Sequence, residues 1–229
     1  MNAGLSFVSC SREALLRGRV ELQKYRICDL ICGKQVRTPV GYEKCEKETK
    51  SARRRMIEYS VFPSAIRDAL FSFTKQGGSL LISGSYVLSD SNDFIYDFGT
   101  DEPILKKETE SEKKFISDVL KCQWVTNKGG NAGDVRSVQS PYKFSSGRHY
   151  TFYTKPNSIR YCVESPDSFV PTNAAGAFTV MRYADSGISA AVAYKGPAYR
   201  VLTLGFPIES LATQSDINAL MKDAVGFLK

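Results

Sequence analysis

The sequence predicts an α/β fold: an open sheet with helices on its faces and an antiparallel extension. In the first half of the chain, apolar strand-like segments alternate with amphipathic helices. From about residue 125 to 195, short segments alternate between apolar and polar residues, as antiparallel strands do. An apolar strand and a closing helix then restore the first pattern. We therefore expect a single α/β domain over 1–229 with an antiparallel insert at about 125–195.

The first half of the chain supplies most of the predicted parallel sheet. Ser11 can cap a short helix that Gly18 ends, because a small polar residue and a glycine suit these two positions. Pro63 fits the start of a longer helix, and Gly77 follows its end. The expected elements are a strand at 5–9, a helix at 12–17, a strand at 25–32, a helix at 63–75, a buried strand at 79–84 and a helix at 111–122.

Residues 34–60 form a long polar connection that we expect to be a surface or functional loop. Within 34–58, eight Lys or Arg residues face four Glu residues. The basic cluster could bind a polyanion, but the interleaved carboxylates favour a solvated loop, and no aromatic motif indicates nucleic acid. The basic cluster comprises Lys44, Lys47, Lys50, Arg53, Arg54 and Arg55, and the interleaved acidic residues are Glu43, Glu46, Glu48 and Glu58.

The second half begins with a segment rich in Gly, Ser and Asn at 128–150. Alternating segments follow it, and the closing helix places apolar residues such as Leu220 and Ala224 on one face. The expected elements are strands at 150–154, 159–164, 177–183 and 188–194, a core strand at 199–205 and a helix at 215–228 that starts at Ser215 or Asp216.

Composition excludes several classes of protein. Hydrophobic residues make up 42% of the chain, so it can bury a core, and the net charge is +7. No apolar run approaches the ~18 residues that a membrane helix needs. Residues 1–16 lack the basic and apolar regions of a signal peptide. We therefore expect no membrane span, and a chain that either stays in the cytoplasm or belongs to a larger exported protein.

The sequence predicts no metal site and no cofactor. Cys28 and Cys32 fall on one face of a predicted strand, and the simpler interpretation is that both are small buried hydrophobic residues. No second Cys or His pair completes a zinc site. Asp90 and Asp93 with Asn92 resemble half of a calcium loop, but its glycine and terminal Glu are missing.

Functional residues are expected at the carboxyl ends of the core strands, where α/β sheets bind their ligands. Three such ends carry glycine and polar residues, so the sequence predicts that they converge on one cleft. The expected cleft residues are Gly33, Lys34, Gln35, Gly84, Ser85, Tyr86, Asp90, Phe206 and Glu209. Tyr86 and Tyr142 could stack on sugar rings, although packing in the core is the commoner role of such residues.

Ser85 is a candidate nucleophile because it follows a strand in a sharp glycine-bearing turn. The nucleophile-elbow pattern requires a glycine two positions later, where Val87 stands. A serine nucleophile also needs a base, and His149 is the only imidazole in the chain. A tight turn that requires small residues is therefore the simpler interpretation of Ser85.

Several segments together resemble the class I glutamine amidotransferase-like domain. They are Ser9-Cys10-Ser11, Tyr25, Asp29-Leu30-Ile31, Gly33-Lys34-Gln35, GGSLLISGSYVLSD at 77–90, SPDSFVP at 165–171 and LGFPIES at 204–210. More narrowly, the chain resembles the version carried by large exported Bacteroides-type proteins that are often labelled xanthan lyase. The resemblance covers nearly the whole chain and implies a flavodoxin-like, three-layer α/β/α sheet.

The resemblance implies an altered active site. Amidotransferases carry a cysteine at the turn where this chain has Ser85, and a His-Pro-Glu sequence where it has Phe206, Pro207, Ile208 and Glu209. The oxyanion-hole glycine falls near Gly33. The glycine and the carboxylate are thus retained, while the nucleophile and the base are not, and no residue set for lyase chemistry is evident.

The function expected from the resemblance is a non-catalytic or degenerate domain of a larger exported, carbohydrate-related protein, periplasmic or extracellular, that acts as a scaffold or binding module. Its expected partners are other domains of that protein and a carbohydrate. The first strand, at 5–9, resembles the family's second strand, which implies either a missing strand or a piece of a longer chain. Two alternatives remain: a hydrolase or lyase-associated enzyme that uses Ser85 and Glu209, and a polyanion-binding module that uses residues 44–55.

Overall fold

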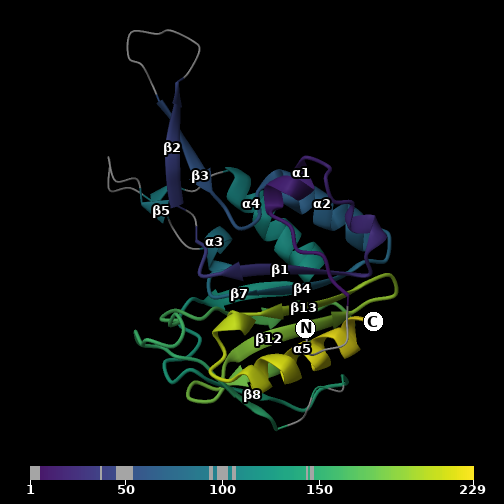
Figure 1. Ribbon diagram of the computed structural model, residues 1–229, viewed down its shortest axis with the longest axis vertical. Coiled ribbons are helices and arrows are strands. Elements are labelled where there is room, and N and C mark those ends of the chain that lie inside the picture. Colours follow the sequence, from purple (N-terminus) through teal and green to yellow (C-terminus); the bar gives the residue numbers. More distant parts are fainter. Residues whose placement is uncertain are drawn as a thin grey trace.

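The computed structural model describes residues 6–36, 38–44, 54–92, 95–96, 103–104, 107–142, 144 and 147–229. Its centre is a seven-stranded mixed sheet, in which three neighbouring strands are parallel and the others antiparallel (Figure 1). The parallel strands are β1 (Ile27–Gly33), β4 (Ser79–Gly84) and β13 (Arg200–Leu204), and the sheet continues through β12 (Ser189–Lys195), β11 (Ala177–Tyr183), β8 (Asp134–Ser137) and β9 (His149–Thr151). The predicted α/β class is confirmed.

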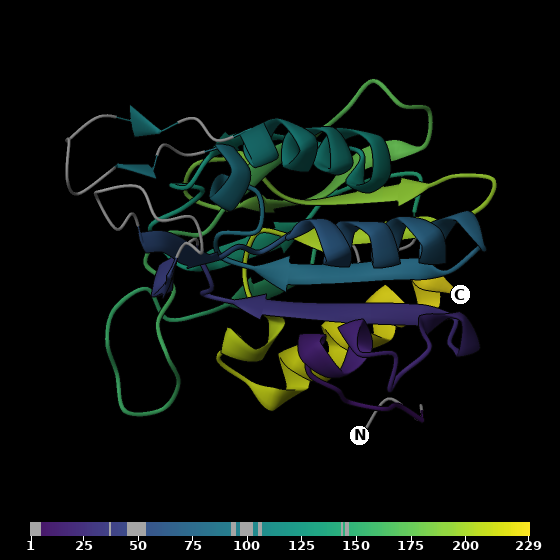
Figure 2. The ribbon, with the colours of Figure 1, turned by 90° about the horizontal axis from the view of Figure 1, so that it is seen from above.

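Helices cover both faces of the sheet: α2 and α4 lie on one side and α5 on the other (Figure 2). The helices are α1 (Arg12–Leu16), α2 (Ser64–Lys75), α3 (Ser89–Asn92), α4 (Lys107–Phe115), which continues as the π-helix η2 (Ile116–Leu120), and α5 (Gln214–Leu228); the 3₁₀ helices are η1 (Leu22–Lys24) and η3 (Ile208–Ser210). Within these described elements, no helix is both long and apolar enough to cross a membrane.

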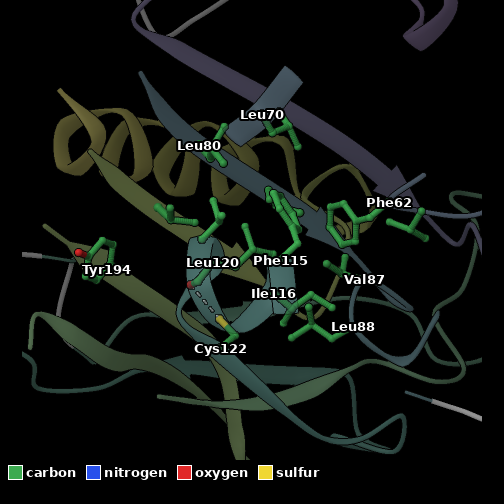
Figure 3. Close-up of a cluster of buried hydrophobic side chains, with 14 of the residues drawn as sticks. Phe62, Leu70, Leu80, Val87, Leu88, Phe115, Ile116, Leu120, Cys122 and Tyr194 are labelled. Atoms are coloured by element: carbon green, nitrogen blue, oxygen red, sulfur yellow. Dashed lines mark hydrogen bonds between the residues drawn. The ribbon is translucent and has the colours of Figure 1, made fainter. Parts of the chain in front are cut away.

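Successive side chains of β4 pack against helices on opposite faces of the sheet. Leu80 and Ile82 pack with α2 and α4, whereas Leu81 packs with α5. All six residues of β4 are buried, as expected for a strand with neighbours on both edges and helices on both faces. Figure 3 shows Leu80 in the cluster of buried side chains that lies on the α2 and α4 face of the sheet. The cluster includes Phe62, which precedes α2, and Phe115 of α4.

Helix α5 forms where the sequence predicts it, with one change at its start. The Thr213 side chain, rather than that of Ser215 or Asp216, caps the helix by accepting a hydrogen bond from the backbone N–H of Asp216. Leu220, Ala224 and Phe227 recur at helical spacing and are buried against the sheet. The apolar face of α5 therefore fixes the position of its first turn beside the parallel strands.

Three smaller two-stranded sheets accompany the central one: β2 (Thr38–Lys44) with β3 (Arg54–Tyr59), β5 (Ile95–Tyr96) with β6 (Pro103–Ile104), and β7 (Cys122–Thr126) with β10 (Ser168–Pro171). The β2–β3 hairpin extends away from the central sheet (Figure 1). Residues 34–60 were predicted as a surface or functional loop; the pairing of two of its segments in antiparallel register was not predicted.

Three other predicted elements differ. Residues 6–10 form no strand, and Phe7 and Val8 are exposed. Residues 159–164 are irregular because the Asn157 side chain accepts hydrogen bonds from two following backbone N–H groups, which competes with strand formation. The helix predicted at 111–122 ends at Leu120, where Lys121 adopts a left-handed conformation with φ of 58°. Cys122 then begins β7.

Candidate functional site

The carboxyl ends of β1 and β4 lie at the same end of the sheet, since the two strands point the same way (Figure 2). The backbone N–H of Ser85 donates a hydrogen bond to the Gly33 carbonyl at 2.8 Å. Glu209, which follows β13, places its Oε1 3.6 Å from the point where a Cβ on Gly33 would lie. The structure thus brings Gly33, Ser85 and Glu209 together, as the strand-end rule predicts.

Ser85 is nevertheless inaccessible at this end of the sheet. The residue is fully buried, and its Oγ has no hydrogen-bond partner among the described residues. Its backbone N–H is occupied by Gly33, so this donor is not free to stabilise an oxyanion. Gly84 packs so closely that an added Cβ would lie 2.7 Å from the Cys32 Cβ. These contacts describe a closely packed structural turn.

No imidazole accompanies Ser85. Phe206, at the position where the resemblance would place histidine, is fully buried and stacks on Phe152 with ring centroids 5.7 Å apart. His149, the only histidine in the sequence, lies on β9 at the opposite edge of the sheet from β1. Its Nδ1 lies 3.4 Å from Asp134 Oδ1. Ser85 therefore has no histidine nearby that could act as its base.

Two further predicted site residues have structural partners. Lys34 forms an ion pair with Glu164, and this ammonium together with the Cys162 thiol lowers the pKa of Glu164 to about 2. Asp90 is buried, and its Oδ2 accepts a hydrogen bond from the Val61 backbone N–H at 2.9 Å. The buried carboxylate of Asp90 therefore connects α3 to the segment after β3.

Gln35 and Tyr86, predicted for the cleft, and Tyr142, predicted as a possible stacking residue, do not line the cavity beside Glu209. Gln35 is exposed and Tyr86 is half-buried. Tyr142 packs against Phe227 with ring centroids 4.9 Å apart. Asp93 lies outside the described residues, and among those described no group of three or more His, Cys, Asp or Glu side chains is placed to hold a metal.

A cavity of about 460 Å³ opens beside Glu209, on the face of the sheet that carries α5. We call it the Asp29–Glu209 cavity. Its polar lining comes from five separate segments and comprises Asp29, Ser83, Arg160, Glu209, Gln214 and Asn218. Its apolar lining comprises Ile31, Ile208, Ile217 and Met221.

The sheet register explains why this cavity exists. Asp29 and Ile31 pair with Leu81 and Ser83 of β4, so all four side chains point to the face that carries α5. Helix α5 packs on β4 and β13. The edge strand β1 is less well covered, and Ile31 remains 64% exposed. The cavity lies where the covering by α5 ends.

Two carboxylates dominate the electrostatics of the cavity. Reduced hydration and the nearby Glu209 carboxylate raise the pKa of Asp29 to about 6. Glu209 Oε1 accepts a hydrogen bond of 2.8 Å from the Tyr161 hydroxyl, and burial together with this carboxylate raises the Tyr161 pKa. Among the described residues, neither Asp29 nor Glu209 forms an ion pair with a basic side chain.

Other polar groups line the cavity, and two of them, Ser83 and Arg160, have atoms without a hydrogen-bond partner among the described residues. Ser83 is 1% exposed, and its Oγ has no hydrogen-bond partner among the described residues. Arg160 donates from Nη1 to the Glu209 backbone carbonyl at 3.0 Å, but its buried Nε is unpartnered there as well. Gln214 Nε2 donates to Asn218 Oδ1 at 3.1 Å, which orders the first turn of α5.

Sequence reasoning found Glu209 but did not select most of this lining. One signal was present: Asp29 places a charge within the apolar run YRICDLIC. Arg160 and Asn218 carry no comparable signal, because the irregular segment and the helix that hold them meet only in the folded chain.

The comparisons with known proteins identify no family. No family model matches the sequence, and no curated protein matches it. Among solved structures, the chain is similar to "Exo-beta-1,4-mannosidase Op5Man5 from Opitutaceae bacterium strain TAV5", with 12% sequence identity and a TM-score of 0.40. The similarity covers 72% of this chain but 23% of the mannosidase chain, so this chain spans about a quarter of that protein's length.

Proposed function

We propose that this chain is a non-catalytic, amidotransferase-like domain of flavodoxin-like architecture that binds a carbohydrate as part of a larger exported protein. The observation that carries the proposal is the contrast between two neighbouring places. Ser85 is buried and has no imidazole beside it, whereas the Asp29–Glu209 cavity presents polar groups without partners.

The chemistry of the cavity fits a carbohydrate. Sugar hydroxyls both donate and accept hydrogen bonds, and the cavity offers carboxylates, amides, a guanidinium and the Ser83 hydroxyl. The aliphatic side chains of Ile31 and Met221 can contact the C–H faces of a sugar ring. A volume of about 460 Å³ falls within the ~300–1,000 Å³ typical of small-molecule sites.

The alternative, a hydrolase that uses Ser85, has less support. A serine hydroxyl becomes a useful nucleophile only with a base within hydrogen-bond reach. Phe206 fills the expected base position with an aromatic ring, and the Ser85 N–H is already paired. The same two observations argue against glutamine hydrolysis.

The test combines binding and activity. Titration calorimetry against a panel of neutral, amine-bearing and acidic oligosaccharides should show binding to at least one of them. Replacing Asn218→Leu on the cavity wall should weaken that binding about tenfold, because a polar group of the lining is replaced by an apolar one. Ser85→Ala should leave the affinity unchanged, and the parent protein should not hydrolyse glutamine. Glutaminase activity that disappears in Ser85→Ala would overturn the proposal.

A further inference from the structure

We propose that the carbohydrate bound in the Asp29–Glu209 cavity carries a free amine, as an amino sugar does. This inference rests on the proposed function and adds the ligand's charge to it. Its basis is the set of charged side chains that line the cavity: two carboxylates, Asp29 and Glu209, and one guanidinium, that of Arg160. Neither carboxylate has a basic partner within the described parts of the chain.

The Arg160 guanidinium does not neutralise the pair. One of its terminal nitrogens is committed to the Glu209 backbone carbonyl rather than to either carboxylate. The formal charge of the lining is therefore negative. An ammonium group placed there gains charge-assisted hydrogen bonds, whereas a ligand carboxylate would meet two like charges.

The two carboxylates lie along one wall of the cavity. Asp29 and Ile31 point to the same face of β1, and Glu209 Oε1 lies 3.6 Å from the point where a Cβ on Gly33, the last residue of that strand, would lie. The carboxylates are near enough for Glu209 to raise the pKa of Asp29. Ile31 and the unpartnered Ser83 hydroxyl are paired in register beside them. Two neighbouring carboxylates with a hydroxyl and apolar surface suit a short oligosaccharide whose amine reaches the carboxylates.

The experiment compares three probes with the full chain at pH 7, where the Asp29 carboxyl, with its pKa of about 6, is mostly ionised. The probes are a fully deacetylated glucosamine disaccharide, its N-acetylated counterpart and a digalacturonate of similar size. We expect the free amine to bind at least about tenfold more tightly than the acetylated sugar, and digalacturonate to bind more weakly than both.

Two carboxylate variants locate the effect. Asp29→Asn and Glu209→Gln keep side-chain size and should each reduce the preference for the free amine while retaining affinity for the acetylated sugar. Asp68→Asn is the matched control, because Asp68 is an exposed carboxylate on α2, across the sheet from the cavity. The control should preserve the full preference.

The two possible failures are distinguishable. If the acetylated disaccharide binds as tightly as the free amine, the inference about the amine is wrong and the carbohydrate-binding proposal stands. If the amine preference persists in both carboxylate variants, the cavity is not its source and the inference is also wrong. If no oligosaccharide of any charge binds, the proposed function itself fails.

Discussion

Gly84 occupies a position at which no side chain fits. A Cβ there would lie 2.7 Å from the Cys32 Cβ, 3.0 Å from Val87 Cγ2 and 3.1 Å from the Gly33 carbonyl oxygen. Two of these neighbours belong to β1 and the third to the turn after β4, so the absence of a side chain allows the two strand ends to approach each other. Ser85, the next residue along the chain, is fully buried.

Replacing Gly84→Ala should therefore lower the free energy of unfolding by about 1–3 kcal/mol, the usual cost of forcing extra volume into a packed site. Denaturant-induced unfolding measures the change. Gly226→Ala is the control, because Gly226 lies inside α5 with no atom within 4 Å of the added Cβ. That variant should be more stable by about 0.5–1 kcal/mol, since alanine favours a helix. Equal stability of Gly84→Ala and the parent would contradict the packing described for this turn.

At the residue scale, the sequence predicted the convergence of strand ends but not which side chains are accessible there. The glycines at 33 and 84 and the carboxylate at 209 were predicted because their spacing relative to apolar strands is visible. The close contacts of Gly84 with Cys32 and Val87, and the burial of the adjacent Ser85, arise only in the folded chain. Whether these residues bind a ligand stays a prediction.

At the scale of elements, the Asp167 carboxyl connects the start of α3 to β7 through hydrogen bonds. Its Oδ2 accepts hydrogen bonds from the backbone N–H groups of Leu88, at 2.7 Å, and Ser89, at 3.1 Å, at the start of α3. Its Oδ1 accepts a hydrogen bond from Trp124 Nε1, on β7, at 3.3 Å. Burial outweighs these hydrogen bonds and raises the pKa of Asp167 to about 7.

This raised pKa predicts a pH dependence of stability. Between the ordinary carboxyl pKa of 3.8 and about 7, the native state retains a proton that the unfolded chain has lost. The contribution of Asp167 is therefore most favourable below 3.8 and is lost as the pH rises toward 7, with each unit of pKa shift equivalent to about 1.4 kcal/mol. Asp167→Asn should show a smaller decline in unfolding free energy between pH 4 and 7 than the parent.

The exposed carboxylate Asp68 on α2 provides the comparison for that experiment. Asp68→Asn should follow the pH profile of the parent. If Asp167→Asn and the parent lose stability in parallel over pH 4–7, the carboxyl of Asp167 is not protonated in the native state at these pH values.

Helices and strands with a clear apolar periodicity were predictable from the sequence. Strands that form only because they pair with another segment were not. The strand at 79–84 and the helix at 63–75 are both confirmed, because their apolar spacing alone defines them. The β2–β3 hairpin lies in a polar segment without that signal, and β7 begins directly after a helix that local pattern continues to Cys122. The cavity was missed for the same reason, since its lining is assembled by the register of β1 on β4 and the placement of α5.

At the scale of the whole molecule, the net charge of +7 raises the question of an anionic partner. Much of the local excess falls in residues 34–58, where Lys and Arg outnumber Glu by eight to four. The structure describes the backbone of Lys44, Arg54 and Arg55 in the β2–β3 hairpin, whereas Lys47, Lys50 and Arg53 lie outside the described residues.

We expect no specific polyanion binding, because the interleaved Lys, Arg and Glu residues offset one another's charge and salt screens interactions between charges in water. Heparin chromatography at ~50 and ~200 mM salt is the measurement, comparing the parent with a variant in which Arg53, Arg54 and Arg55 are all replaced by Gln. The two proteins should show similar weak retention. Tight binding by the parent at low salt that falls steeply with salt, and is absent in the triple variant, would instead support a polyanion-binding role.

The order of strands in the central sheet has a consequence for how the chain is made. Strand β4 lies between β1, which precedes it in the sequence, and β13, and residues 85–199 must be synthesised before β13 leaves the ribosome. During that interval the apolar strand SLLISG has one edge without its native partner. An unpaired apolar edge can pair with strands of other chains, so we expect the growing chain to be most prone to aggregation during this interval.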